Sequence, residues 1–216
     1  MAPSEVGNEA PRASRHTRRK AATRAKITQA ANQLFSVKGY QETSVEDISE
    51  LADVAVRTIY MHFPSKAAIL LDHFDRWLDA LVDGILRQPI DTPIADAVET
   101  ALAEMVADGW EDRSYGDIEE SPPAALGLIA GPPEVAGYMM QAWAVVQERI
   151  ANDARERGSY SADSLIPQAR AIAVFAACMA PIMTARLSLN TDPLPEDATA
   201  NGLIGTFITH LTRGAL

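Results

Sequence analysis

The chain has 216 residues and a formal net charge of −10, with 47% apolar and 22% charged residues. This composition is ordinary for a globular protein, and the length allows one large domain or two small ones. No apolar run reaches the roughly 18 residues of a membrane-spanning helix, and the arginines near the N-terminus precede no apolar signal segment. The single cysteine, Cys178, excludes an internal disulfide and a cysteine-based zinc site. We therefore expect a cytoplasmic protein that does not bind membranes.

The charge is distributed unevenly along the chain. Residues 1–63 carry nine Lys or Arg and seven Asp or Glu, whereas the remaining residues carry ten and twenty-two. Within residues 12–38 there are eight basic residues and no acidic one. One end of the molecule is therefore expected to attract a polyanion that the rest repels, although a solvated basic helix explains the same pattern.

The first 38 residues divide into a tail and a helix. Residues 1–16 are mostly small, polar or basic, and we expect a disordered tail. From residue 17 the apolar residues recur at helical spacing, and Gly39 follows a basic last turn, as at many helix ends. We predict one amphipathic helix over 17–38. Its apolar stripe consists of Ile27, Ala30, Ala31, Leu34 and Phe35.

Two short helices follow. Ser44 and Asp47 have the spacing of a capping box, with Asp in place of the usual Glu or Gln, and predict a helix of about two turns. After a break at 52–54, a third helix fits 55–63 and ends before Pro64. The predicted buried face of the second helix is Val45, Ile48 and Leu51.

The rest of the chain is also predicted to be helical. Ser65 caps a fourth helix from Lys66 to about Arg87, and no alternating run of apolar and polar residues suggests a strand. We therefore predict an all-α fold of about nine helices. The further predicted helices are 94–110, 124–130, 134–157, 164–189 and 196–214, with an acidic break at 111–123.

The second and third helices have the arrangement of a helix-turn-helix motif. A major groove about 12 Å wide admits one helix, and the amides at a helix N-terminus favour phosphate. On the third helix, Val54, Ile59 and Phe63 are predicted to face the core. Arg57 and Thr58 would lie on the other face, where side chains reach base edges.

The segment "ITQAANQLFSVKGYQETSVEDISELADVAVRTIYMHFPSKAAIL" resembles the DNA-binding head of the TetR family of bacterial transcriptional regulators. The matching motifs are "LFSVKGY", "TSVEDI" and "TIYMHFPSK", which occur in order within about residues 20–70. The resemblance implies a homodimer that binds a palindromic operator and releases it when a small molecule binds. It also implies a helix-turn-helix DNA-binding domain over 17–65, after the tail at 1–16, and a ligand-binding and dimerisation domain over 66–216.

The family motif implies a role in DNA binding for eight residues. Each has a structural alternative: Tyr60, for example, lies at helical spacing from Phe63 and would equally suit the core. The basic residues Arg12, Arg15, Arg18 and Arg19 are further candidates for contact with a groove or with phosphates. The eight residues are Thr43 and Ser44 (phosphate), Val56, Arg57 and Thr58 (bases), and Tyr60, His62 and Lys66 (backbone).

Two residues depart from the family pattern. Asp53 stands where the family usually has Gly, and it places a negative charge near the expected phosphates. Ala55 stands where Ser or Thr commonly caps the recognition helix, and loss of that cap lowers helix stability by about 1 kcal/mol. These departures are the best support for an alternative reading, in which the protein regulates mainly through protein contacts and its DNA-binding head is weakened.

Large apolar side chains in the C-terminal part suit either a packed core or an adaptable cavity between helices. With the family resemblance, we predict a pocket for a small apolar or amphipathic effector, whose chemical class the residues do not indicate. The candidate pocket residues are Phe74, Trp77, Trp110, Tyr138, Met139, Trp143, Phe175 and Met179.

The last two predicted helices suit dimerisation. One is rich in small residues, which allow close approach, and the other has large apolar residues at i, i+4 and i+8. Two helices from each partner would form a four-helix bundle, as the family uses. The candidate interface residues are Ala176, Met183, Leu203, Phe207 and Leu211.

No arrangement of residues indicates catalysis, a metal site or a cofactor. The four His, one Cys and scattered carboxylates form no triad, metal-ligand spacing or glycine-rich phosphate loop. We therefore predict a regulator rather than an enzyme, with double-stranded DNA and a small-molecule effector as its partners.

Overall fold

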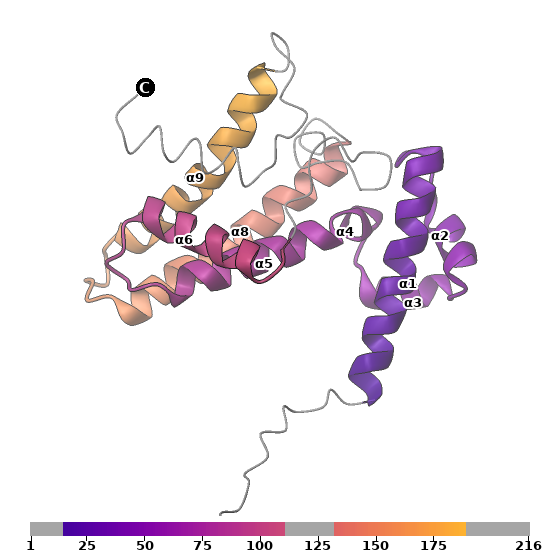
Figure 1. The fold of residues 1–216 in the computed structure, drawn as a ribbon, viewed down its shortest axis with the longest axis horizontal. Coiled ribbons are helices and arrows are strands. Elements are labelled where there is room, and N and C mark those ends of the chain that lie inside the picture. The colour runs from indigo at the N-terminus through magenta and orange to yellow at the C-terminus, as the bar shows by residue number, and fades with distance from the viewer. Residues whose placement is uncertain (1–14, 111–131, 189–216) are drawn as a thin grey trace, which may run out of the picture. The chain divides into compact units, whose positions relative to one another are not determined.

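A computed structural model describes residues 15–110 and 132–188 (Figure 1). Eight α-helices and no strand lie within these ranges, so the predicted all-α fold is confirmed. The predicted helices at 124–130 and 196–214 fall outside the described residues. The eight helices are α1 (Arg15–Lys38), α2 (Val45–Ala52), α3 (Val56–His62), α4 (Lys66–Leu70), α5 (Asp72–Arg87), α6 (Ile94–Ala107), α8 (Pro133–Arg157) and α9 (Ile166–Ser188).

The chain divides into two compact units, Met1–Pro64 and Ser65–Leu216. We call the described residues of the first unit the head and those of the second the body. In the head, α1 packs against α2, and α2 packs against α3. The largest buried side chains of the head are Ile27, Phe35, Ile48, Ile59 and Phe63.

Helix α1 begins at Arg15, two residues before the predicted start, and ends at Lys38. Its apolar stripe is buried as predicted, although Leu34 is only half-buried. Gly39 follows with a φ of +82°, the left-handed conformation that ends many helices and that glycine adopts without strain.

Helix α2 begins with the predicted capping box. The Ser44 Oγ accepts a hydrogen bond of 3.0 Å from the Asp47 N–H, and the Asp47 carboxylate accepts one of 2.9 Å from the Ser44 N–H. The predicted buried face is wrong at Leu51, which is 46% exposed. Ile48 and Ala52, one turn apart, face the core instead, and Leu51 lies to the side of that line.

Asp53 ends α2 and starts the turn into α3. Its φ and ψ are both 51°, a left-handed conformation that Asp tolerates better than most residues. The Ser49 Oγ donates a hydrogen bond of 2.6 Å to the Val54 carbonyl, and the Asp53 N–H donates one of 3.2 Å to the Glu50 carbonyl. These bonds hold the turn, and the predicted break between the two helices is confirmed.

The single helix predicted over 66–87 is wrong. The structure has two helices, α4 and α5, separated at Leu71, whose φ is −94° and ψ is 12°. Hydrogen bonds of 2.9 Å continue on both sides, from the Leu71 N–H to the Ala67 carbonyl and from the Asp75 N–H to the Leu71 carbonyl. Residues 67–72 are all buried, so packing surrounds this stretch on every side. Tertiary contacts therefore decide the kink, which no Pro or Gly in the sequence signals.

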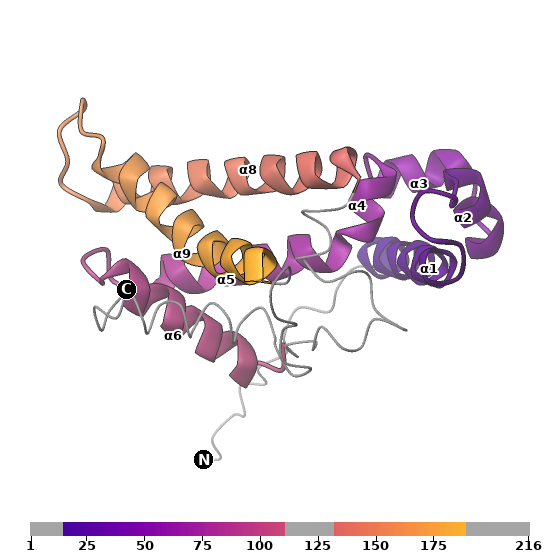
Figure 2. The ribbon, with the colours of Figure 1, turned by 90° about the horizontal axis from the view of Figure 1, so that it is seen from above.

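In the body, α5, α6, α8 and α9 pack around one apolar core (Figure 2). Helix α8 ends at Arg157 before Gly158, as predicted. Helix α6 ends at Ala107, three residues before the predicted end, and is followed by the left-handed Gly109. None of the described helices combines the length and apolar character needed to cross a membrane.

Gly84 lies where α5 meets α6, and a Cβ added there would approach the Ala101 Cβ to 2.7 Å. Gly84→Ala should therefore lower the free energy of unfolding by about 1–3 kcal/mol, because neither backbone can yield easily. Urea unfolding followed by circular dichroism measures this change.

Gly137→Ala on α8 is the matched control, since a Cβ there meets no atom within 4 Å. That substitution should raise the free energy of unfolding by up to about 1 kcal/mol through helix propensity. Equal effects of the two substitutions would contradict the close packing of α5 on α6.

Candidate nucleic-acid interface

The exposed side chains of α3 share one face. Arg57, Tyr60 and Met61 are exposed and spaced i, i+3 and i+4, which places them side by side on a helix. Tyr60 is 53% exposed and Met61 74% exposed, so neither belongs to the core. Ile59 and Phe63, each 1% exposed, anchor the opposite face. The structure thus presents a cation, a phenol and a flexible apolar side chain outward from one short helix.

The other predicted base-reading residues lie at the edges of this face. Val56 and Thr58 are half-buried. The N-cap of α3, Ala55, makes no side-chain hydrogen bond, although its carbonyl accepts one of 2.7 Å from the Thr58 N–H. Arg57 is therefore the predicted base-reading residue with the most open access to a groove.

The two residues predicted to contact phosphate at the start of α2 differ in exposure. Ser44 is exposed, and its hydroxyl closes the capping box. Thr43 is 1% exposed, and its hydroxyl donates a hydrogen bond of 2.8 Å to the Gly39 carbonyl. The Thr43 side chain therefore supports the loop before α2 from inside the head. Hydrogen bonds from the Ser44 backbone and side chain lower the pKa of Asp47, which stays ionised in the cap.

His62 ends α3 and is half-buried. Its Nδ1 is buried and has no hydrogen-bond partner. Burial lowers the pKa of His62, and the positive charges of Arg24 and Lys20 lower it further. The imidazole is therefore neutral at pH 7, so any contact it makes with phosphate is a neutral hydrogen bond.

Arg24 of α1 holds the C-terminal end of α3. Its guanidinium donates a hydrogen bond of 2.7 Å to the His62 carbonyl and lies 4.0 Å from the centre of the Phe63 ring. A cation at a helix C-terminus interacts favourably with the unpaired carbonyls there. The sequence did not distinguish Arg24 from the other basic residues of α1. Its contacts with His62 and Phe63 depend on how α1 packs in the folded head.

Lys66 begins α4, in the second unit, and is half-buried. The predicted Ser65 cap is confirmed, since the Ser65 Oγ accepts a hydrogen bond of 3.1 Å from the Ala68 N–H.

Most of the eight candidate effector residues meet in the body core. Trp143 and Met179 belong to this core, and Phe74, Trp77, Trp110 and Phe175 pack against it. The Trp143 and Phe175 rings meet edge to face at 5.2 Å, and the Phe74 and Trp77 rings stack at 6.2 Å.

The other two candidates lie next to each other on α8. Met139 is buried, whereas Tyr138 is half-buried and its hydroxyl donates a hydrogen bond of 2.6 Å to the Asp75 carboxylate.

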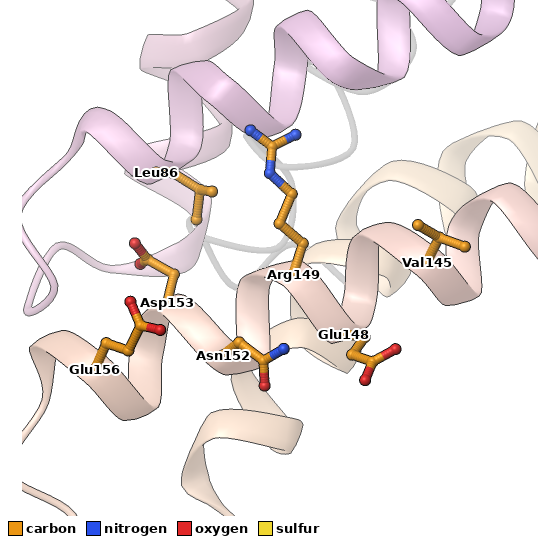
Figure 3. A pocket seen from close by; sticks show the side chains of 7 residues that line it. All are labelled: Leu86, Val145, Glu148, Arg149, Asn152, Asp153 and Glu156. Carbon is orange, nitrogen blue, oxygen red and sulfur yellow. The ribbon is translucent and has the colours of Figure 1, made fainter.

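An open groove of about 430 Å³ lies elsewhere on the body (Figure 3). Arg149 points from α8 toward α5, where it pairs with Asp79 and Asp83, and Leu86 of α5 lies at the same edge. The rest of the lining is mostly charged, which suits solvent better than an apolar effector. None of the eight candidate effector residues lines it. The lining residues are Leu86, Val145, Glu148, Arg149, Asn152, Asp153 and Glu156.

Several apolar residues of α9, and Leu165 just before it, are exposed in the part of the chain that the structure describes. Leu165, Ile166 and Ile172 are 74%, 57% and 59% exposed. Ala169, Ala173 and the predicted interface residue Ala176 are also exposed. The other candidate interface side chains, those of Met183, Leu203, Phe207 and Leu211, fall outside the described residues.

Comparison with known proteins decides the family. A family model described as "Bacterial regulatory proteins, tetR family" matches residues 27–72. MftR of Mycobacterium tuberculosis, a transcriptional regulator provisionally assigned to mycofactocin biosynthesis, is 30% identical over 164 residues, which cover 73% of this chain and 77% of MftR. The chain belongs to the TetR family. It is accordingly a DNA-binding transcriptional regulator and not an enzyme.

Two further relatives agree with this assignment. EthR of Mycolicibacterium smegmatis, an HTH-type transcriptional regulator, is 28% identical over 143 residues, which cover 62% of each chain. The structure of FadR of Thermus thermophilus, a TetR-family transcriptional repressor in complex with lauroyl-CoA, has a TM-score of 0.50 and 20% identity over 89% of this chain and 95% of FadR. The second comparison shows a shared fold.

Two residues of this TetR-family head were not predicted. Met61 shares the exposed face of α3 with Arg57, and the i, i+4 spacing of the two residues was a signal available in the sequence. Arg24 had no such signal, since its partners are a backbone carbonyl and a ring from another helix.

The lowered pKa of His62 predicts how the stability of the head depends on pH. In the unfolded chain His62 takes up a proton near its ordinary pKa of about 6.5, whereas the folded head resists that proton. Stability should therefore be full above that pH and fall as the pH drops from about 6.5 toward the folded pKa. Thermal unfolding at pH 7.5 and pH 5.5 should show a smaller loss for His62→Gln than for the wild type.

His16→Gln, which removes an exposed histidine from α1, is the control and should keep the wild-type pH dependence. An identical loss of stability in His62→Gln and wild type would contradict the assignment of a neutral, buried imidazole.

Proposed function

We propose that this TetR-family regulator is a repressor, which binds a palindromic operator as a homodimer and releases it when a small effector binds the body. It acts in the cytoplasm, on the DNA of the cell. The observation that carries the proposal is the exposed face of α3, where Arg57, Tyr60 and Met61 lie together above the buried Ile59 and Phe63.

The chemistry of this face suits the major groove. The Arg57 guanidinium can donate two hydrogen bonds to a guanine edge, and Met61 offers apolar contact to a thymine methyl group. Tyr60 and His62 would hold the backbone, together with Ser44 and Lys66. Val56 and Thr58 are half-buried at the edges of the exposed face. They would contact bases only if the walls of the groove also reached those edges. We leave the Thr43 side chain out of the proposed interface because it is buried.

The two departures from the family pattern bear on affinity. Ala55 leaves α3 without a side-chain cap, and the exposed Asp53 carboxylate would repel a nearby phosphate. Helix α3 nevertheless spans Val56–His62, supported by its buried residues and by Arg24. We therefore favour DNA binding over the alternative in which the head is weakened and the protein acts through protein contacts.

We place the effector at the aromatic side chains of the body core. Trp143, Phe175 and Met179 supply apolar surface. The Trp143 Nε1 is buried without a hydrogen-bond partner, and an unsatisfied buried donor costs about 1–3 kcal/mol. An amphipathic effector that brings an oxygen acceptor to this N–H would remove that cost. This chemistry supports an amphipathic effector over a purely apolar one.

The proposed switch is a change in the spacing of two recognition helices. In a dimer, the two α3 helices must lie about 34–36 Å apart to enter successive major grooves. Some dimers would have their α3 helices at a spacing that does not fit two major grooves. An effector that binds these dimers more tightly increases their share and so reduces binding to DNA. An allosteric coupling of about 1–3 kcal/mol would lower operator affinity about 5- to 150-fold.

The exposed apolar face of α9 supports the homodimer. Ala169, Ile172 and Ala176 follow one another at i, i+3 and i+7 along one side of the helix, and Leu165 lies just before its first residue. Exposed apolar residues at every step of such a line are unfavourable in water. A second copy that presents the same face would cover both, as in a symmetric dimer.

Arg57→Ala should reduce affinity about 5- to 150-fold for each half-site of the operator, because a bidentate contact to a base contributes about 1–3 kcal/mol and the dimer would lose two of them. The DNA upstream of the protein's own gene is the first fragment to test, by fluorescence anisotropy at several salt concentrations. Binding to mixed-sequence DNA should change much less, since Arg57 is proposed to read a base.

Arg155→Ala removes the same charge from an exposed position on α8 and should bind the operator as the wild type does. A wild-type protein that binds no upstream or genomic fragment at low salt would overturn the proposed function and favour the alternative of protein contacts.

Ile172→Asp should yield monomers and abolish operator binding, because a carboxylate would be buried at the centre of the α9 face. Light scattering coupled to gel filtration measures the mass. Val106→Asp on α6, where Val106 is 56% exposed, is the control and should remain dimeric. A dimer that persists in Ile172→Asp would place the interface elsewhere.

A further inference from the structure

Arg57 and Met61 lie on the side of α3 that is farthest from the head core. Ile59 and Phe63, one turn apart and each 1% exposed, define the side that faces the core. Arg57 and Met61 each precede one of these anchors by two residues, which corresponds to about 200° around the helix axis. The pair therefore stands almost opposite the anchors, and we call it the crest of α3.

The exposure of the neighbouring residues agrees with this placement. Val56 and Thr58 lie about 100° to either side of Arg57 and are half-buried. Met61 is 74% exposed, whereas Tyr60, on one flank of the crest, is 53% exposed. In the proposed complex the crest points to the floor of the major groove, where the base edges lie, and the flanks point to the phosphate walls. Met61 is thus placed to contact a base, as Arg57 is.

The two side chains of the crest suit different bases. The Arg57 guanidinium can donate to both acceptors of a guanine edge. The Met61 side chain has no N–H or O–H group, and its sulfur is only a weak acceptor. Among the groups that bases present in the major groove, the methyl group of thymine is the apolar one. The unbranched, flexible thioether can adjust to reach that methyl group.

The length of the crest limits how far apart the two bases can lie. Four residues of an α-helix span about 6 Å along its axis. Successive base pairs of a duplex are about 3.4 Å apart. A helix that follows the groove therefore brings Arg57 and Met61 to bases that are one or two pairs apart.

We propose that each half-site of the operator carries a thymine within two base pairs of the guanine read by Arg57, and that Met61 selects this thymine by packing against its methyl group. This inference rests on the proposed function, to which it adds a feature of the operator sequence and the residue that reads it. At the same position a cytosine amino group or a purine nitrogen or oxygen would face Met61 without a hydrogen bond, which is unfavourable.

The test replaces single thymines of the operator by deoxyuridine, which removes the methyl group and keeps the base pair. Burial of one methyl-sized group favours binding about fourfold, so the change should weaken wild-type binding about fourfold in one half-site and about 15-fold in both. Fluorescence anisotropy with the upstream fragment measures the affinity, after footprinting has located the half-sites. Deoxyuridine outside the half-sites should leave the affinity unchanged.

Replacement of single guanines by 7-deazaguanine, which lacks the N7 acceptor, locates the base read by Arg57. At that guanine the replacement should weaken the wild type but not Arg57→Ala. The thymine that is sensitive to deoxyuridine should lie within two base pairs of it.

Met61→Ala should bind the thymine and deoxyuridine operators equally, because no side chain remains to reach the methyl group. Met61→Leu should keep the preference for thymine, since Leu is apolar and of similar volume. Val37→Ala is the control: Val37 is 79% exposed on another helix of the head, and its loss should leave the preference as in the wild type. Thermal unfolding of Met61→Ala should match the wild type, because the side chain is exposed.

The outcomes separate this inference from the proposed function. If the wild type binds the operator and no deoxyuridine within two base pairs of the identified guanine changes its affinity, the thymine contact is refuted and the repressor stands. An equal loss in the wild type and in Met61→Ala would mean that the methyl group acts through the shape of the duplex, and it would also refute the role of Met61. If the wild type binds no fragment, the proposed function fails, and this inference fails with it.

Discussion

The burial of Ile59 and Phe63 is the constraint on which the exposed face of α3 depends. Helix α3 has seven residues, too few to be stable alone in water. With both side chains 1% exposed, the helix has one rotational position in the head. That position turns Arg57, Tyr60 and Met61 outward. Phe63 also links the end of α3 to α1, where Arg24 lies over its ring.

The start and the end of α3 are supported differently. Its start has no side-chain cap, because Ala55 offers no acceptor, and the tight turn before it is held by the Ser49 hydroxyl. Its end is bound by a charged hydrogen bond from Arg24. Helix α3 is thus held by a side-chain hydrogen bond at its end but not at its start. This asymmetry suits a helix that adjusts its first turn to bases while its last turn keeps register with the backbone.

In the body, the same side chains serve the core and the proposed effector site. Trp143 and Met179 are buried among the residues that join α5, α6, α8 and α9. An effector that enters there must displace packing contacts, so its binding would be coupled to the positions of these helices. Cys178 belongs to this core as well, and burial raises the pKa of its thiol to about 12, so it is an unreactive packing group rather than a redox sensor.

Local patterns in the sequence were enough to predict the all-α fold, the Ser44 and Ser65 caps, the end of α1 at Gly39 and the turn at Asp53. Each depends on interactions within a few residues, such as a hydroxyl that reaches an amide three positions on. The kink at Leu71, the exposure of Leu51, the burial of Thr43 and the contact of Arg24 with α3 depend on which helix lies against which. Residues far apart in the chain supply those partners, as when Arg24 reaches His62 across 38 positions. Periodicity identifies the apolar side of a helix, but only the packed structure decides which neighbour covers each residue and which side chains stay exposed.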